Sequence, residues 1–236
     1  MKALALVTAL SLTFMLAANA QDSKPSLKSN GVTKQGAEAA ATIDVSAIQK
    51  KIDEYTEAIK NDPKNDKYYG ARGQNYWRIG KFDQAVDDLN HAITLNPNAA
   101  AYFEVRGDAF GKMHRNREAF ADYSKAISAG RRSHYLFVQK GYSAVLLQDY
   151  RSAEEAARTA LDLKPTDIDT LALIGGVEKK LGKYHEALKF LNKAILLSPL
   201  DPSLLNLRAE TYYEMGQKEL GDKDLKLSKT LEARRR

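Results

Sequence analysis

The sequence contains no cysteine. Without cysteine there is no disulfide scaffold, so the fold must be stabilised by packing alone. The same absence excludes a lipid-anchored bacterial precursor, which needs a cysteine at its cleavage point. An exported domain without disulfides suits a bacterial periplasm at least as well as a eukaryotic secretory route.

Long apolar stretches are also few. At the start of the chain, MKALALVTALSLTFMLAANA, Lys2 precedes an apolar stretch over 3–18, and residues 18–20 have the small-x-small form of a signal-peptidase site. This stretch is shorter than the roughly 20 residues that span a bilayer. We therefore predict a cleaved signal peptide over 1–20 and an exported protein, periplasmic or secreted, with no membrane span after cleavage. An uncleaved membrane anchor is the alternative.

The chain has only a small excess of one charge. Lys and Arg number 36 and Asp and Glu number 30, a formal net charge of +6, and the basic residues are spread along the sequence. This balance supports solubility more than a basic patch, so we expect no nucleic-acid partner.

Signatures of an enzyme are missing as well. The four histidines form no i, i+4 pair, which excludes a helix-borne zinc site. Residues 141–145 (GYSAV) lack the second glycine of a nucleophile elbow and fall inside an expected helix. Residues 173–176 (LIGG) are not followed by the Lys-Ser or Lys-Thr of a phosphate loop. We predict a non-enzyme with no catalytic residue, cofactor or metal. The histidines are His91, His114, His134 and His185.

What the sequence does contain is a repeat of 34 residues. RIGKFDQAVDDLNHAITLNPN from Arg78 and KLGKYHEALKFLNKAILLSPL from Lys180 are nearly alike and start 102 residues apart, three times 34. Steps of 34 align residues of one type without an insertion. The columns include Gly73, Gly107, Gly141 and Gly175; Ala58, Ala92, Ala126, Ala160 and Ala194; Ala85, Ala119, Ala153 and Ala187; and Pro63, Pro97, Arg131, Pro165 and Pro199.

Each column has a physical reason in a pair of helices. Tyr69, Gly73 and Tyr76 share one helical face, where glycine lets a neighbouring helix approach closely. Proline ends the second helix, because it disfavours helical backbone before it and donates no N–H. Where Arg131 replaces the proline, we expect Gly130 to supply the C-terminal cap.

These columns resemble the tetratricopeptide repeat (TPR) family, whose motif has a large residue, Leu-Gly, an aromatic residue, then Ala-x-x-x-aromatic and a late proline. The resemblance covers about residues 46–236. It implies an all-α fold, a right-handed superhelix of stacked antiparallel helix pairs with about five 34-residue units. The motif is seen most fully in Tyr69-x-x-Arg72-Gly73-x-x-Tyr76 and Phe103-x-x-Arg106-Gly107-x-x-Phe110.

The repeat also organises the chain. Residues 21–45 are rich in Ser, Lys, Gly and Ala with no apolar period, which predicts a flexible linker. Residues 46–65 match the second half of a unit, which predicts an N-terminal cap helix starting at the capping box Ser46-x-x-Gln49. The predicted units are 66–99, 100–133, 134–167, 168–201 and, with a degenerate repeat and a polar capping helix, 202–236.

The resemblance implies that the first helix of each unit lines a groove. Groove positions of the third unit are apolar and aromatic, and aromatic anchors carry much of the energy of many interfaces. Packing between adjacent first helices is the alternative role for these side chains. The predicted binding residues are Tyr135, Val138, Tyr142, Leu146, Trp77, Arg78, Gln74, Glu104 and Asp108; the same mapping includes Lys67, Lys112, Val145, Asp169, Lys179, Lys180, Asn206, Glu210, Tyr213 and Glu214.

The family's two-carboxylate clamp, which binds acidic peptide tails, is not present. Its positions are occupied by Gly70, Gln74, Val105, Tyr135 and Gln139. We predict a non-catalytic scaffold or adaptor that holds a partner protein or extended peptide in the groove. The alternative is an accessory or regulatory subunit of a cell-envelope enzyme complex that docks by its convex face. An apolar groove is also compatible with self-association.

Overall fold

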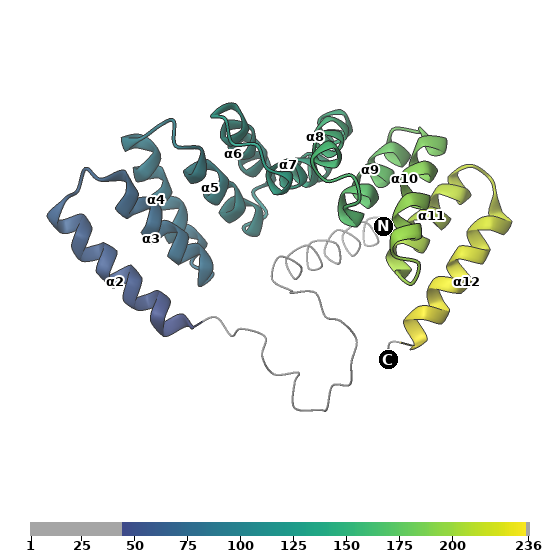
Figure 1. Cartoon of the computed structure of the whole chain (residues 1–236), viewed down its shortest axis with the longest axis horizontal. Helices are drawn as coiled ribbons and strands as arrows, with labels where there is room; N and C mark the ends of the chain where they lie inside the picture. The colour runs from purple at the N-terminus through teal and green to yellow at the C-terminus, as the bar shows by residue number, and fades with distance from the viewer. Residues whose placement is uncertain (1–43, 235–236) are drawn as a thin grey trace, which may run out of the picture. The chain divides into compact units, whose positions relative to one another are not determined.

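The computed structural model describes residues 44–234, in which all regular structure is helical. The helices follow one another in an arc (Figure 1). The predicted all-α repeat fold is thereby confirmed. The helices are α2 (Val45–Asn61), α3 (Asp66–Arg78), α4 (Phe82–Leu95), α5 (Ala100–Lys112), α6 (Asn116–Ser128), α7 (His134–Leu146), α8 (Tyr150–Leu163), α9 (Ile168–Lys180), α10 (Tyr184–Leu197), α11 (Pro202–Glu214) and α12 (Lys218–Arg234).

The helices pack as pairs, α3 with α4 and so on to α11 with α12, and each pair contacts the next. In addition, α3 contacts α5, α7 contacts α9, and α9 contacts α11. Figure 1 shows α4, α6 and α8 along the outer side of the arc, with α3, α5 and α7 along its inner side. We call the surface formed by the odd-numbered helices α3 to α11 the inner face.

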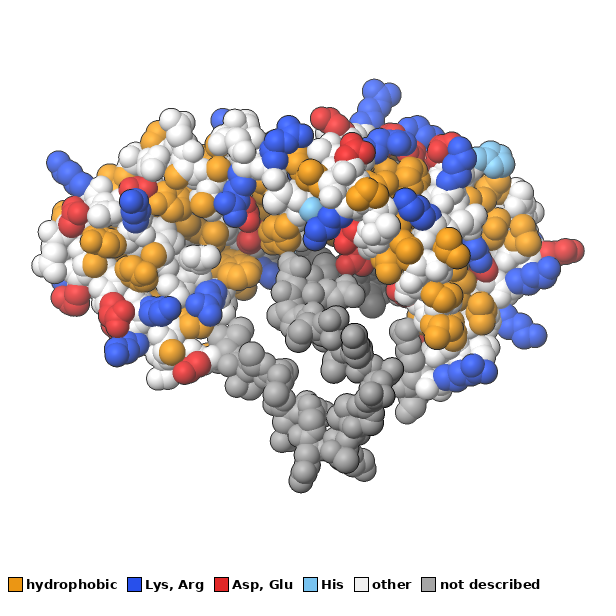
Figure 2. Space-filling view, in the orientation of Figure 1, with side chains coloured by type: hydrophobic (Ala, Val, Ile, Leu, Met, Phe, Trp, Pro, Cys, Tyr) orange, Lys and Arg blue, Asp and Glu red, His pale blue; other side chains and the backbone are white. Residues whose placement is uncertain are grey.

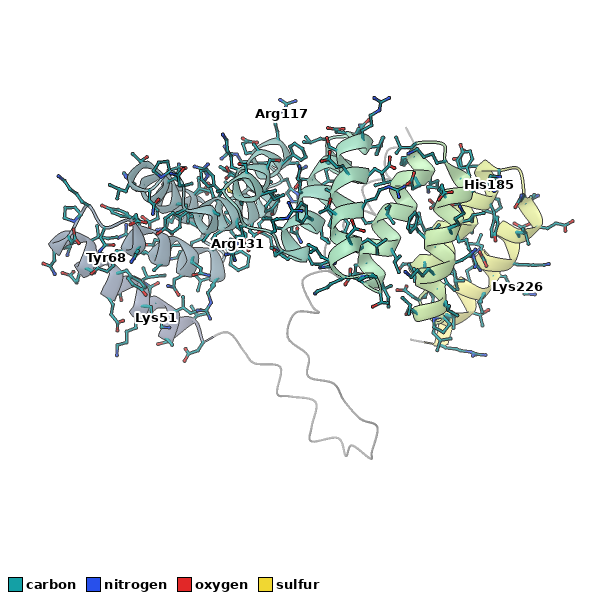
Figure 3. The ribbon with its side chains drawn as sticks, turned by 45° about the horizontal axis from the view of Figure 1, so that its top comes forward. Lys51, Tyr68, Arg117, Arg131, His185 and Lys226 are labelled. Atoms are coloured by element: carbon teal, nitrogen blue, oxygen red, sulfur yellow. The ribbon has the colours of Figure 1, made fainter. Side chains whose placement is uncertain are left out.

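The first helix, α2, covers the exposed side of the first pair. Its Ile48 and Ile52 are buried, and the ring of Tyr55 lies 6.5 Å from that of Tyr68 on α3 (Tyr68 is labelled in Figure 3). The predicted capping box was wrong, because α2 starts at Val45 and the Asp44 carboxylate accepts the Ala47 N–H at 3.0 Å. An earlier acceptor thus takes the role assigned to Ser46.

The turn inside each pair depends on one residue with left-handed backbone. After this residue the chain closes a helix cap, as where the Lys81 N–H donates to the Tyr76 carbonyl at 2.9 Å. Glycine adopts this conformation at little cost, whereas a residue with a Cβ is strained in it. The five residues, 34 apart, are Gly80 (φ 76°), His114 (φ 58°), Gln148 (φ 60°), Gly182 (φ 74°) and Gly216 (φ 73°).

The second helix of a pair ends as the sequence predicts. Helix α4 stops at Leu95, two residues before Pro97. Helix α6 has no such proline; there Gly130 has φ 92°, and the Arg131 N–H reaches the Ala126 carbonyl at 3.1 Å. The predicted glycine cap is confirmed.

Small residues bring the two helices of a pair together. The alanine column Ala85, Ala119, Ala153 and Ala187 is fully buried. A Cβ added to Gly107 of α5 would lie 2.9 Å from the Tyr123 ring of α6, closer than side chains normally approach. Close packing of this kind leaves no room for a methyl group.

Buried ion pairs join the helices in three of the five pairs. The Arg106 guanidinium donates two hydrogen bonds, of 2.7 and 2.8 Å, to Asp122 and a third to Asn90 of the preceding pair. Bidentate pairing of this kind is strong and directional. Equivalent pairs, 34 residues away in each direction or by a multiple of 34, are Arg72 with Asp88 and Arg208 with Asp224.

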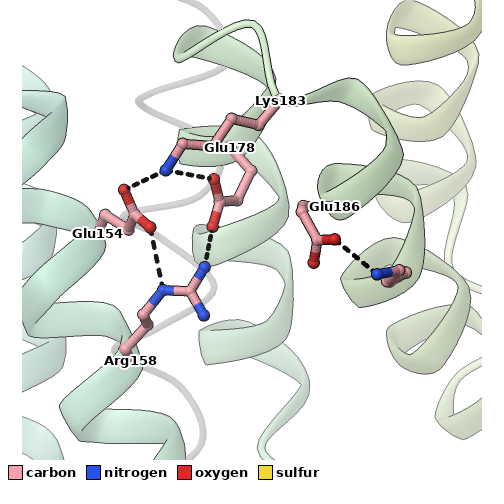
Figure 4. Close-up of polar contacts among 6 residues, drawn as sticks. Glu154, Arg158, Glu178, Lys183 and Glu186 are labelled. Atoms are coloured by element: carbon pink, nitrogen blue, oxygen red, sulfur yellow. Dashed lines mark hydrogen bonds and ion pairs between the residues drawn. The ribbon is translucent and has the colours of Figure 1, made fainter.

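The fourth pair replaces this ion pair by Ile174 and Phe190, and the charges move elsewhere. Glu178 of α9 is fully buried, and its carboxylate pairs with Arg158 of α8 and, at 3.3 Å, with Lys183 (Figure 4). The acid now lies on the first helix and the guanidinium on the preceding second helix. This exchange joins the third unit to the fourth.

The signal peptide predicted over 1–20 and all but the end of the linker predicted over 21–45 lie outside the described residues. Within residues 44–234, no helix combines the length and apolar character that crossing a membrane requires. Over the face shown in Figure 2, Lys and Arg side chains are interspersed with Asp and Glu.

Candidate binding surface on the inner face

The inner face is built by a regular meeting of neighbouring units. The ninth residue of one unit lies beside the second residue of the next, 27 positions later in the sequence. At the second boundary these residues are Asp108 of α5 and Tyr135 of α7, and the Tyr135 hydroxyl donates to Asp108 Oδ1 at 2.8 Å. At the third boundary they are Tyr142 of α7 and Asp169 of α9, so the order of tyrosine and aspartate is reversed.

Asp108 is a junction of three helices. Besides Tyr135 of α7, the hydroxyl of Tyr123 on α6 donates to the same oxygen at 2.8 Å. Burial raises the pKa of Asp108 to about 7, although both tyrosine hydrogen bonds oppose this shift. The charge of Glu104 adds to the increase, and Lys112 acts against it. Of the predicted groove residues, Asp108 is therefore a carboxyl group that titrates near neutrality.

Tyr142 and its neighbours on α7 form the apolar middle of the inner face. Tyr142 packs against the cluster of Phe137, Val138 and Ala160, and burial raises the pKa of its phenol, with contributions from Asp169 and then Asp167. Val138 is 6% exposed, so it supports this surface from beneath. Val145 and Leu146 are half-buried at the end of the helix.

Asp169 stands apart from the other carboxylates of the inner face. It is half-buried in the first turn of α9, and no hydrogen bond or ion pair joins it to any residue within 44–234. Burial raises its pKa, as do the nearby charges of Asp167 and Asp201.

The predicted residues of the first two units are more separated. Gln74 and Arg78 of α3 are exposed, whereas Trp77 is half-buried against the core cluster that includes Val86 and Phe103. The Trp77 Nε1 has no hydrogen-bond acceptor in the described part of the chain. These side chains lie away from the apolar middle on α7.

Glu104 of α5 is held in place by an ion pair. Its carboxylate pairs with the guanidinium of Arg131, which follows α6 (Figure 3). At the other end of the inner face, Lys179 of α9 pairs with Glu210 of α11. The nine predicted residues are thus spread over three helices, and only those on α7, with Asp108, form one continuous surface.

Sequence reasoning missed the contacts between units. Tyr123 was not among the predicted residues, and neither was the Asp66 carboxylate, which accepts from Tyr102 at 2.8 Å and Asn96 at 3.0 Å. These hydrogen bonds lower the pKa of Asp66, while burial and then Asp66 raise the pKa of Tyr102 to about 12. The reversed tyrosine and aspartate, 27 apart at two boundaries, were the signal available in the sequence.

No group of three or more His, Asp or Glu side chains in residues 44–234 is arranged to hold a metal ion. The arrangement instead provides an aromatic and aliphatic strip beside carboxylates. Such a surface suits non-covalent recognition of a polypeptide, in which apolar contacts supply affinity and charges supply specificity.

Comparisons with known proteins match the geometry. A family model described as Tetratricopeptide repeat matches residues 66–99, 134–167 and 168–199. No curated protein sequence matches the chain.

Several solved structures share the fold. YrrB, described as a TPR protein with an unusual peptide-binding site, is 19% identical with a TM-score of 0.71, covering 76% of this chain and 93% of its own. A MamA protein is 18% identical with a TM-score of 0.67, covering 71% and 92%. MamA from Desulfovibrio magneticus RS-1, from residue 41 to its end, is 15% identical with a TM-score of 0.67, covering 71% and 95%. At these identities the likeness concerns the fold.

Proposed function

We propose that this stack of tetratricopeptide repeats is a non-catalytic scaffold that binds a partner protein or extended peptide along its inner face. The observation that carries the proposal is the strip on α7, where Tyr135, Tyr142 and Leu146 lie on the side of the helix that faces the inside of the arc. Unpaired strips of this kind between polar neighbours are typical of interaction sites.

The likeness to YrrB supports this function, since YrrB is described as having a peptide-binding site. An extended segment on the inner face would contact α5, α7 and α9 together. The pre-formed stack loses little entropy on binding, so modest contacts can give a specific complex.

A photo-crosslinking experiment tests the proposal. A photoreactive phenylalanine analogue replaces Leu146 on the inner face or, as the matched control, Glu155 on α8, which is exposed on the other helix of the same pair. Both variants are expressed in the native host, checked for wild-type helicity and melting temperature, and irradiated. We expect one specific partner to be captured from position 146 and not from 155.

The alternative is an accessory subunit that docks by its even-numbered helices. One observation favours it: on α10, Leu196 is 81% exposed, and Leu163 of α8 is 46% exposed. Capture of one partner from position 196 or 155, with none from 146, supports this alternative and contradicts binding by the inner face.

We also propose that the protein is exported, on the basis of the leader-like residues 1–20. Cell fractionation with N-terminal sequencing of the purified protein tests this point. A mature chain that begins near Gln21 in the periplasm or medium supports export with cleavage. An intact Met1 in the membrane fraction supports the uncleaved anchor, and an intact chain in the cytoplasm contradicts export.

A further inference from the structure

We propose that the segment bound by the inner face is basic: a Lys or Arg of the partner pairs with Asp169, and an adjacent apolar residue packs on the strip formed by Tyr142, Val145 and Leu146. This inference rests on the proposed function and specifies the chemistry of the partner.

The first argument is that Asp169 has no role in the fold, although its neighbours do. Asp167 caps α9, accepting the Thr170 N–H at 2.9 Å and the Thr170 hydroxyl at 2.6 Å. Asp201 caps α11, accepting the Ser203 N–H at 2.8 Å. Asp169 makes no hydrogen bond and no ion pair with residues 44–234.

The second argument comes from the other carboxylates of the inner face. Asp108 accepts two tyrosine hydroxyls, Glu104 pairs with Arg131, and Glu210 pairs with Lys179. Their charges or lone pairs are therefore used within the chain, as is usual for half-buried acidic groups. Asp169 has the opposite arrangement, with two like charges nearby and no cation.

The third argument concerns position. The influence of Asp169 on the Tyr142 phenol places its carboxylate beside the apolar strip. A cation bound there would gain attraction from Asp169, Asp167 and Asp201 together, in a site where burial reduces screening by water. An acidic segment would meet three like charges instead, so charge complementarity favours a basic segment.

The experiment uses the full chain to select from a random peptide library displayed on phage. The variants Asp169→Asn and Asp169→Lys are selected in parallel, with Glu155→Lys as a control that makes the same change of charge on the other helix face. We expect the wild type and Glu155→Lys to enrich peptides with Lys or Arg next to an aliphatic or aromatic residue. Asp169→Asn should lose this enrichment, and Asp169→Lys should reverse it.

Fluorescence anisotropy then quantifies binding of one selected peptide and of its copy with Gln in place of the basic residue. Asp169→Asn should raise the Kd of the basic peptide about tenfold, which corresponds to about 1.4 kcal/mol, and should leave the Kd of the Gln copy unchanged. Equal loss for both peptides, or selection of peptides without basic residues, overturns the basic-segment inference but leaves inner-face binding intact. Failure of every chain to select any peptide overturns the proposed peptide-binding function together with the inference.

Discussion

The Tyr135 hydroxyl donates a 2.8 Å hydrogen bond to the Oδ1 of Asp108, 27 residues earlier in the sequence. Tyr123 donates to the same oxygen at the same distance, so one carboxyl oxygen holds α5, α6 and α7 together. This junction joins the second unit to the third and lies directly beside the apolar strip. Its protonation therefore bears on the stability of the stack.

We expect the free energy of unfolding to fall as pH rises from about 4 to about 7. The pKa of Asp108 is raised to about 7 in the folded protein, whereas an unfolded Asp titrates near 3.9. Between these values the folded state binds more protons, so the contribution of Asp108 is complete below about pH 4 and is lost as pH rises through its folded pKa. Urea denaturation at pH 4.5 to 8 measures the slope, up to about 1.4 kcal/mol per pH unit for one proton.

The variant Asp108→Asn is the control for this pH dependence. An amide oxygen still accepts from Tyr123 and Tyr135 but has no proton to lose, so the slope between pH 4.5 and 7 should become flatter by about one proton. An unchanged slope would assign the titration to another group, and the adjacent Glu104 would be substituted next.

We expect Gly107→Ala to destabilise the protein by about 1–3 kcal/mol, the usual cost of overpacking. The new Cβ would lie 2.9 Å from the Tyr123 ring, and this buried ring has little room to move. Gly111→Ala, one turn later in α5, places a Cβ at an ordinary 3.7 Å from the Tyr123 hydroxyl and should be neutral or stabilising by up to about 1 kcal/mol. Chemical denaturation of both variants decides the point; equal effects would contradict close packing at Gly107.

The turns at His114 and Gln148 provide a test in the opposite direction. Both have left-handed backbone where the three equivalent residues are glycine. We expect His114→Gly and Gln148→Gly each to raise stability by about 0.5–1 kcal/mol, because relief of Cβ strain exceeds the added freedom of the unfolded chain. The reverse change, Gly182→Ala, should lower the melting temperature, and a stabilising Gly182→Ala would refute the argument.

The ion pair of Arg106 with Asp122 allows a swap within the same protein. Asp122→Ala should cost about 3–5 kcal/mol, because the partly buried guanidinium loses its partner. The double variant Arg106→Ile with Asp122→Phe copies Ile174 and Phe190 of the fourth unit, and we expect it to recover at least half of that loss. A double-mutant cycle by urea denaturation measures the coupling. A double variant less stable than Asp122→Ala would show that the second unit cannot accept the apolar pair.

The sequence by itself determined the architecture. Columns 34 residues apart, such as Gly73 with Gly107 and Pro97 with Pro165, predict helix pairs because close approach and helix termination depend on local chemistry. The column from Gly80 to Gly216 could also have indicated the left-handed turns, although His114 and Gln148 conceal it. The start of α2 was misplaced, since both Asp44 and Ser46 can cap a helix and only the backbone decides between them.

Only the tertiary structure decided which groove residues are free to bind. Val138 and Asp169 occupy implied groove positions alike, yet Val138 is buried and Asp169 has no partner within residues 44–234. The exchange of charges between Arg158 and Glu178 likewise involves different columns of the repeat. The physical reason is that a period describes what recurs within a unit. Burial and charge pairing depend on contacts between units, where the side chains of two different repeats meet.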